Sequence, residues 1–208
     1  LSDDGKYQAE RSDRGLLAVN HEYVVGPYSL HPAGITAGAA RVPSEVEKEI
    51  NAHGVSVVEV KRGSTGTDMS MVRGSRFNRR VTSATEIAIT GPAKGSALMK
   101  TRFSPDGTKT RGTNNNCANG YTPWGTYLTC EENFLNVISR AAGDDAKRSP
   151  AEIVALKRYG LPENRKSPYL WDTAQGEQYA RWNSKVSGAT AAEDHRNSFN
   201  TFGWVVEI

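Results

Sequence analysis

Short segments rich in β-branched residues, each bounded by turn-forming residues, constrain the fold of this chain more than any other feature. The clearest span residues 16–25, 55–61, 86–90 and 202–208, and weaker ones span 97–103 and 125–130. Runs of Val, Ile, Tyr and Thr of this length are typical of strands, and Gly, Pro and Asp around them are typical of turns. Short, irregularly spaced strands with long connections favour an all-β chain, a β-propeller or a sandwich, over a parallel α/β sheet.

One helix is expected between the first two strands. Residues 44–54 begin with Ser44 as a candidate N-cap, carry Glu47 three positions later, and end at Gly54. A Ser followed by Glu at this spacing predicts a capping box, and Gly is a common residue just after the end of a helix.

A second helix is expected near residues 149–160. Ser149 is its candidate N-cap, Pro150 its first helical residue and Glu152 the third residue after the cap, and Gly160 follows its last turn. Its apolar positions lie three apart and predict one stripe that docks on the rest of the protein: Ile153, Leu156 and Tyr159.

The length of 208 residues predicts a single domain, residues 1–208, and the segment 144–200 is expected to be a helical and irregular insertion within it. Its part from 160 to 200 is polar and interrupted by prolines, so we expect a surface connection with a short helix near 172–181. The chain begins without Met and stops inside an apolar run at Ile208, and we therefore expect the natural chain to continue and the domain to be incomplete.

Charge and hydropathy exclude several partners. Lys and Arg total 26 and Asp and Glu total 23, a formal charge of +3, which gives no basic signature for nucleic acid or a membrane surface. No apolar run approaches the ~18–20 residues that cross a bilayer. We expect neither a nucleic-acid nor a membrane partner.

The two cysteines lie in different surroundings. Cys117 falls in an amide-rich polar stretch, residues 113–120, which we expect to be a loop and which offers oxygen atoms for a ligand shell. Cys130 follows apolar residues, where a small buried thiol packs well. A disulfide between them is possible from their spacing. A thiol enzyme is disfavoured, because no His or Lys that could activate either cysteine lies nearby in sequence.

Carboxylates within the strand-like segments are the sharper functional signal. They are Glu22, Glu131, Glu132 and Glu207. Each alone is usually a solvent-facing strand residue, but an unpaired carboxylate in an apolar strand needs a partner, a proton or a metal. Together with Cys117 they suggest a cluster of carboxylates and one thiolate. Oxygen ligands suit Ca²⁺ or ferric iron, and the thiolate adds a preference for a transition metal.

Other polar and aromatic residues near these positions have ordinary interpretations. Asn20 shares the strand face of Glu22, whereas His21 points to the opposite face and is expected to be packed or hydrogen-bonded. Trp124 and Trp204 are expected in the core, as large aromatic residues usually are.

Three motif blocks resemble the PhoX family of bacterial alkaline phosphatases. They are NHEY at 20–23, NCA at 116–118 continued by TPWGTYLTCEEN at 122–133, and FGWVVE at 202–207. The blocks occur in order across nearly the whole chain, and the middle block is long and specific.

The resemblance implies a six-bladed β-propeller, of which this chain would supply about half. It also implies a monomeric enzyme, exported by the twin-arginine route to the periplasm or secreted, that hydrolyses phosphate monoesters. The cofactor of the family is a cluster of two ferric irons and three calcium ions around a bridging oxo group. Its phosphate-binding arginine and further acidic ligands lie downstream of the third block, and the sequence singles out no substitute such as Arg111.

The resemblance also assigns roles to individual residues. Cys117 matches the iron-binding thiolate and Glu207 a carboxylate ligand. The resemblance makes Glu22 and the pair Glu131 and Glu132 further iron or calcium ligands, without deciding between the two adjacent residues. It gives two amides the task of orienting ligands or contacting phosphate: Asn20 and Asn116. The alternative is a non-catalytic propeller scaffold or a calcium-stabilised binding module.

Overall fold

Antiparallel pairing organises the strands into three small sheets in the part of the chain that the structure, a computed structural model, describes: residues 6, 8, 10–24 and 29–208. In the first sheet β2 (Gly54–Arg62) pairs with β1 (Arg14–His21), β3 (Met69–Met71) and β4 (Arg79–Val81). The second sheet contains β5 (Glu86–Ala88) and β6 (Lys109–Arg111). The third has the order β7 (Asn116–Tyr121), β8 (Tyr127–Glu131) and β9 (Val205–Glu207). The mostly β character is confirmed; the sheets are open, so closure into a propeller stays a prediction.

The observed strands differ from the expected ones in three places. β1 ends at His21, so Glu22 follows the strand, and Val25 lies outside the described residues. The strand expected at 97–103 is wrong: Ala97–Met99 forms a 3₁₀ turn, η3, because the Ser96 side chain accepts a hydrogen bond from the backbone N–H of Leu98. The loop expected at 113–120 is also wrong, since most of it forms β7 by pairing with β8.

The two longer helices test the capping predictions with opposite results. α1 (Pro43–Ala52) begins two residues earlier than expected, with Val42 instead of Ser44 as N-cap and no side-chain cap, so the capping box at Ser44 is wrong. Proline at the first helical position presets the backbone there and displaces Ser44 into the first turn. In α2 (Pro150–Arg158) the capping box between Ser149 and Glu152 is confirmed.

The apolar stripe of α2 is only partly buried. Leu156 is fully enclosed, whereas Tyr159 is 54% exposed and contacts the ring of Phe199 edge-on at 6.2 Å between centroids. Docking of α2 thus depends mainly on one residue of the predicted stripe.

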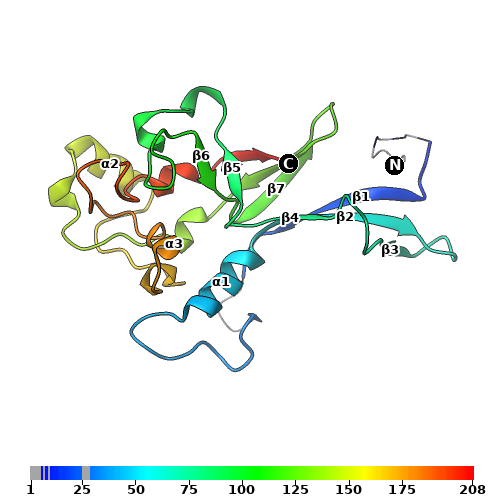
Figure 1. Ribbon diagram of the computed structural model, residues 1–208, viewed down its shortest axis with the longest axis horizontal. Coiled ribbons are helices and arrows are strands. Elements are labelled where there is room, and N and C mark those ends of the chain that lie inside the picture. Colours follow the sequence, from blue (N-terminus) through cyan, green and yellow to red (C-terminus); the bar gives the residue numbers. More distant parts are fainter. Residues whose placement is uncertain (1–5, 7, 9, 25–28) are drawn as a thin grey trace.

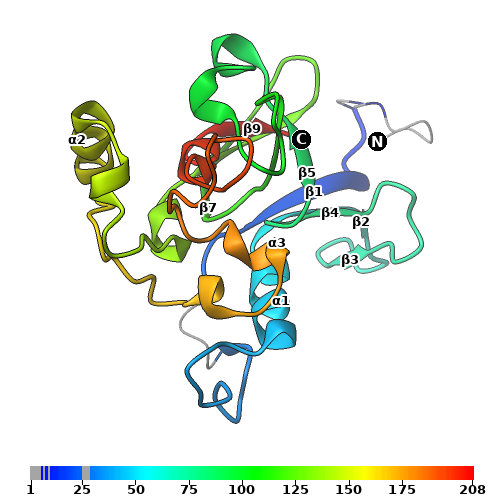
Figure 2. The ribbon, with the colours of Figure 1, turned by 60° about the vertical axis from the view of Figure 1, so that its left-hand side comes forward.

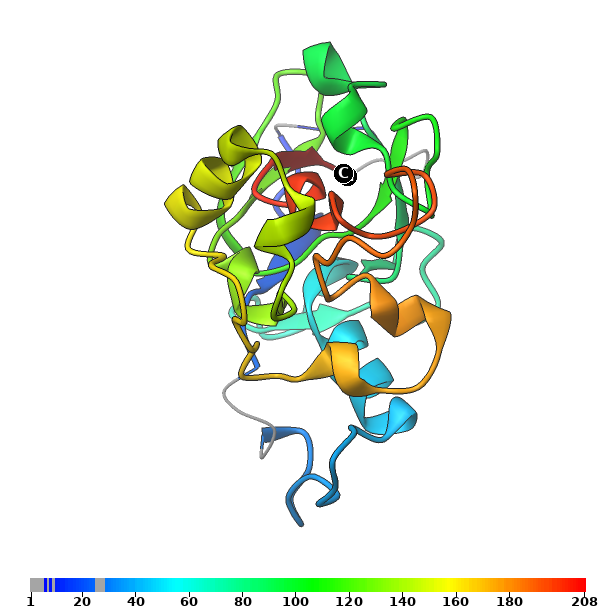
Figure 3. The same cartoon turned by 90° about the vertical axis from the view of Figure 1, so that its left-hand side faces the viewer.

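The hydrophobic core lies between α1 and residues 134–202, which is the opposite of the surface connection expected for 160–200. Trp171 and Trp182 are fully buried with ring centroids 4.9 Å apart. The short helical segments expected near 172–181 are present as η6 (Trp171–Thr173) and α3 (Glu177–Ala180). α3 lies beside α1 (Figures 2 and 3), and the Tyr179 hydroxyl donates to the Pro43 carbonyl at 3.1 Å. The segment 160–200 is polar on average, but its few, widely spaced aromatic residues are buried in the core.

A buried ion cluster accompanies this core. The Glu49 carboxylate is fully buried and is bonded by the Arg41 guanidinium, by Nε2 of His31 at 3.0 Å and by Nε1 of Trp171 at 2.6 Å. In the described chain the partners of this carboxylate are buried or partly buried protein groups, so its charge is compensated within the protein.

The sheets and the core occupy different parts of the molecule. Figure 1 shows β1, β2 and β3 at one end of the long axis and α2 at the other. Among the described residues, no helix has both the length and the apolar composition needed to cross a bilayer.

Candidate metal centre

Asn20, in β1, fastens the first sheet to the third. Its Nδ2 donates to the carbonyl of Cys117 at 3.0 Å and to that of Ala118 at 3.3 Å. Its Oδ1 accepts from the hydroxyls of Tyr127 at 3.0 Å and Thr129 at 2.9 Å. Both the nitrogen and the oxygen of the Asn20 side chain are therefore hydrogen-bonded. These bonds position the backbone of Cys117 relative to the end of β1.

Three of the predicted ligands converge where these sheets meet. Glu22 follows β1, Cys117 lies in β7 and Glu132 follows β8, and one ligand atom of each lies within 4.8 Å of the other two. The register of β7 against β8 shifts between Asn116 and Asn119, so Cys117 sits in an irregular part of the strand. Such bulges re-aim side chains and are frequent next to functional sites.

The carboxylates of the cluster oppose deprotonation of its thiol. The hydrogen bond with Glu132, burial and the charge of Glu22 together raise the pKa of the Cys117 thiol to about 11. A thiol with this pKa keeps its proton at neutral pH, whereas a nearby metal ion favours the thiolate. Among the described residues, neither Glu22 nor Glu132 forms an ion pair with a basic side chain.

The donor set fits a metal ion. Ligand atoms that surround an ion at about 2.0–2.6 Å lie roughly 3–5 Å from one another, and the three atoms here meet that condition. Two carboxylates and, once deprotonated, a thiolate would combine hard and soft donors, a set that suits a transition-metal ion.

Glu131 has a different environment from its neighbour. Its Oε1 accepts from the Thr113 hydroxyl at 2.7 Å and the Asn114 N–H at 3.0 Å, and its Oε2 accepts from the N–H groups of Gly203 at 2.8 Å and Trp204 at 3.3 Å. Burial raises the pKa of this carboxyl despite these bonds. In this structure Glu131 joins the segment before β7 to the segment before β9, outside the cluster. Its predicted role as a ligand stays a prediction.

Glu207 also lies outside the three-residue cluster. It is in β9 opposite Leu128, and its Oε1 accepts from the Thr126 hydroxyl at 2.5 Å and from Nε1 of Trp124 at 2.8 Å. These hydrogen bonds lower the pKa of Glu207. The core position expected for Trp124 is wrong, because the ring is 72% exposed at the tip of the β7–β8 hairpin. As for Glu131, the ligand role of Glu207 stays a prediction.

Buried amides stand directly behind the cluster. Nδ2 of Asn116 donates to the hydroxyls of Thr113 at 2.7 Å and Thr129 at 3.1 Å. Its Oδ1 is buried and, within the described chain, lacks a hydrogen-bond partner, as do Oδ1 of Asn115 and Nδ2 of Asn114. The run of three asparagines was the available sequence signal for this polar interior, but only Asn116 was singled out.

The remaining sequence predictions have mixed outcomes. His21 is hydrogen-bonded to Ser56 at 2.8 Å, as expected. Both cysteines are free, and Cys130 is half-buried. Arg111 stacks over Phe103 at 4.1 Å, on the second sheet.

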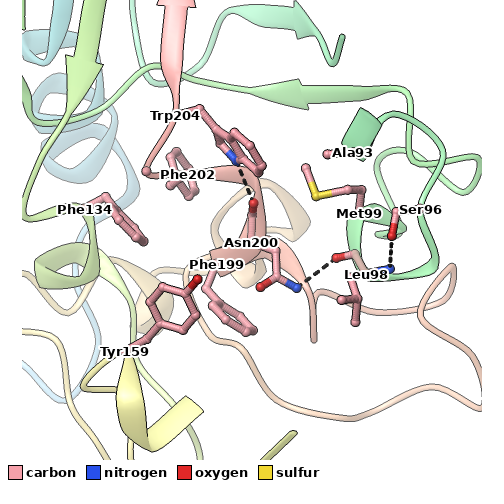
Figure 4. A pocket seen from close by; sticks show the side chains of 11 residues that line it. Ala93, Ser96, Leu98, Met99, Phe134, Tyr159, Phe199, Asn200, Phe202 and Trp204 are labelled. Atoms are coloured by element: carbon pink, nitrogen blue, oxygen red, sulfur yellow. Dashed lines mark hydrogen bonds between the residues drawn. The ribbon is translucent and has the colours of Figure 1, made fainter. Parts of the chain in front are cut away.

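A cavity of about 410 Å³ lies near the start of β9 but differs in chemistry from the cluster (Figure 4). Its lining is apolar and aromatic apart from Ser96 and Asn200. The core position expected for Trp204 is wrong: this ring is 46% exposed, lines the cavity and donates from Nε1 to the Asn200 carbonyl at 2.8 Å. Hydrophobic lining without ligand groups does not suit a metal or a phosphate.

The fold and the cluster define a β-rich protein with two carboxylates and a cysteine brought together at a junction between sheets. The family described as alkaline phosphatase PhoX matches residues 3–208, and the chain belongs to this family. A solved structure of Pseudomonas fluorescens PhoX in complex with vanadate, a transition state analogue, is similar: the sequences are 37% identical and the TM-score is 0.75. The match covers 97% of this chain and 31% of that one, so this chain spans about a third of its solved relative. No curated protein matches this chain.

Proposed function

We propose that the protein containing this chain is a metal-dependent phosphatase that hydrolyses phosphate monoesters. The observation that carries the proposal is the convergence of Glu22, Cys117 and Glu132 from two of the three family motif blocks. Residues distant in sequence have little reason to gather like charges at a sheet junction unless a cation is bound there.

Iron and calcium are the proposed cofactors. Cys117 and the two carboxylates would hold an iron-containing centre, with calcium on neighbouring carboxylates such as Glu131 and Glu207. When bound, the metals would supply positive charge that neutralises the developing negative charge of a phosphoryl group. Asn20 would hold the Cys117 backbone in place, and Asn116 would keep a polar, donor-lined interior behind the thiolate.

Several properties of the whole protein belong to the same proposal. Residues beyond this chain would complete a six-bladed propeller and the substrate site, since the chain spans 31% of the similar P. fluorescens protein. We propose a monomer in the periplasm or secreted, acting on soluble phosphate monoesters.

The test is elemental analysis and a phosphate-ester assay on the purified protein and two matched variants. Cys117→Ser is expected to lose bound iron together with hydrolysis, whereas Cys130→Ser, which changes the other free cysteine, is expected to keep both. An iron-replete, fully active Cys117→Ser protein would refute the metal centre. Stoichiometric calcium in a wild-type protein that hydrolyses no ester would instead support the non-catalytic binding module.

A further inference from the structure

Arg181 is a buried cation that pairs with no carboxylate of the described residues. Its side chain is 92% removed from solvent, since the residue is 8% exposed, and its guanidinium stacks over Trp182 at 4.1 Å. Nη1 donates to the Arg111 carbonyl at 3.0 Å and Nη2 to the Ser83 carbonyl. Nε is buried and, among the residues that the structure describes, has no acceptor. A buried charge in this state is costly unless a counter-charge is supplied.

A second arginine shares a small cavity with it. Arg111 stacks over Phe103 at 4.1 Å, and both arginines line a cavity of about 20 Å³. The other lining residues are Thr101, Thr110, His195, Ser198, Thr201 and Phe202. A volume of this size holds about one water molecule or one monatomic ion.

Within the part of the chain that the structure describes, neither arginine of the cavity forms an ion pair, and the nearby carboxylate of Glu177 has other partners. His195 uses Nε2 on Glu177 at 3.1 Å, and that carboxylate is also shared with Arg102 at 3.3 Å. Glu177 therefore already has two partners and is 56% exposed. Burial, and next the charge of Arg111, lower the pKa of Arg181 to about 9.

The polar lining consists of donors as well as charges. In the described chain, the Thr110 hydroxyl has no hydrogen-bond partner and the Thr101 hydroxyl only accepts, from the N–H of Ser104 at 3.2 Å. Ser198 already donates its hydroxyl to the Arg181 carbonyl at 2.6 Å. Two guanidinium groups and free hydroxyl hydrogens around one ion-sized space form an environment for an anion.

We propose that this cavity binds a single chloride ion between Arg181 and Arg111. The ion accepts hydrogen bonds from the arginines and the threonine hydroxyls, and its charge compensates the buried guanidinium. Phosphate and sulfate are too large for the cavity. The site is also distinct from the proposed metal centre, because the two share no residue. Chloride bound here stabilises the packing of residues 181–202 against β6.

The test measures thermal unfolding of the protein at constant ionic strength while chloride replaces gluconate, an anion too large for the cavity. The melting temperature is expected to rise with chloride and to saturate. Arg111→Gln is expected to weaken the apparent chloride affinity by about tenfold or more, the loss of one charged hydrogen bond. Arg102→Gln is the matched control, because Arg102 is an exposed neighbour outside the cavity lining; its chloride response should remain.

Diffraction from crystals grown in bromide locates the ion directly. An anomalous peak between the two arginines supports the proposal. The proposal is overturned by water alone at that position, by a carboxylate from elsewhere in the protein occupying it, or by equal melting temperatures in chloride and gluconate. It is also overturned if Arg111→Gln retains the full chloride response.

Discussion

Two regions of the molecule differ in how their carboxylates are compensated. One is the core between α1 and residues 134–202, and the other is the sheet junction that carries Cys117. In the core, Glu49 is fully buried and is surrounded by Arg41, His31 and Trp171. At the junction, Glu22 and Glu132 approach Cys117, and within the described chain no basic side chain pairs with either carboxylate. The first arrangement is complete in itself and stabilises the fold, whereas the second, in the proposed function, is completed by a bound metal ion. Partners, more than burial, distinguish a structural charge from a functional one.

The largest expected effect is in the core. Glu49→Gln removes the nearer of the two carboxylates beside the buried Arg41 guanidinium, leaving Glu45 at 3.9 Å, and should lower the free energy of unfolding by about 3 kcal/mol. Glu47→Gln, an exposed substitution on the same helix, should change it by less than about 0.5 kcal/mol. Urea unfolding of the metal-free protein measures both. Equal stability of the two variants would remove the distinction between the regions.

The next effect is at the junction and concerns binding instead of folding. Glu132→Gln should weaken iron binding by about a hundredfold or more, because a direct ligand matters at least as much as its outer-shell partners. In the metal-free protein the same change lowers the pKa of Cys117 from about 11, since the bond and charge of Glu132 contribute to raising it. Alkylation of Cys117 by iodoacetamide at pH 8 should therefore accelerate.

Glu86→Gln is the control for that experiment, because Glu86 is an exposed strand carboxylate paired with Lys109. It should alter neither iron content nor the alkylation rate. An unchanged alkylation rate in Glu132→Gln would mean that Glu132 does not control the thiol.

Adjacent residues sharpen the comparison further. Glu131→Gln replaces an oxygen that accepts two hydrogen bonds with an amide NH2 group, which can only donate, so it should lower the free energy of unfolding by about 1–3 kcal/mol. The metal-free Glu132→Gln protein should lose much less, since that carboxylate is exposed. Denaturant titrations of the two metal-free variants check this order, and the reverse order would exchange the roles of the two residues.

Local signals in the sequence predicted local features well. The capping box at Ser149 depends on near neighbours, and the strands at 55–61 and 125–130 and the hydrogen-bonded side chain of His21 were readable from residue type and alternation; all are observed. The three-residue cluster was predicted because its members fall in motif blocks of a family, a signal that survives separation along the chain.

Features that depend on distant partners were not predictable in this way. Trp171 and Trp182 lie in polar sequence, and apolar residues from α1 and from several separate segments of 134–202 pack around them to form the core. Glu131 and Glu132 are chemically identical in the sequence, and donors from two distant segments, residues 113–114 and 203–204, give Glu131 its different environment. The bulge that aims Cys117 likewise depends on pairing with β8.

The smallest expected effect is at the start of α2, and the start of α1 serves as its comparison. It tests whether the N-cap of α2 contributes to the stability of the core region. Ser149→Ala removes the N-cap and should lower the free energy of unfolding by about 1 kcal/mol at pH 7, whereas Ser44→Ala, which removes no cap, should lower it little.

The same cap predicts a pH dependence. Burial raises the pKa of Glu152, but hydrogen bonds from Ser149 and the charge of Arg148 outweigh burial and hold this pKa below its usual 4.5. A depressed pKa contributes stability above 4.5 that disappears as the pH falls through the lower, folded-state pKa. The difference in melting temperature between wild type and Ser149→Ala should therefore become smaller as the pH falls from about 5 to about 3. Thermal unfolding at several pH values measures this difference. A difference that grows on acidification would show that Ser149 does not stabilise the Glu152 carboxylate.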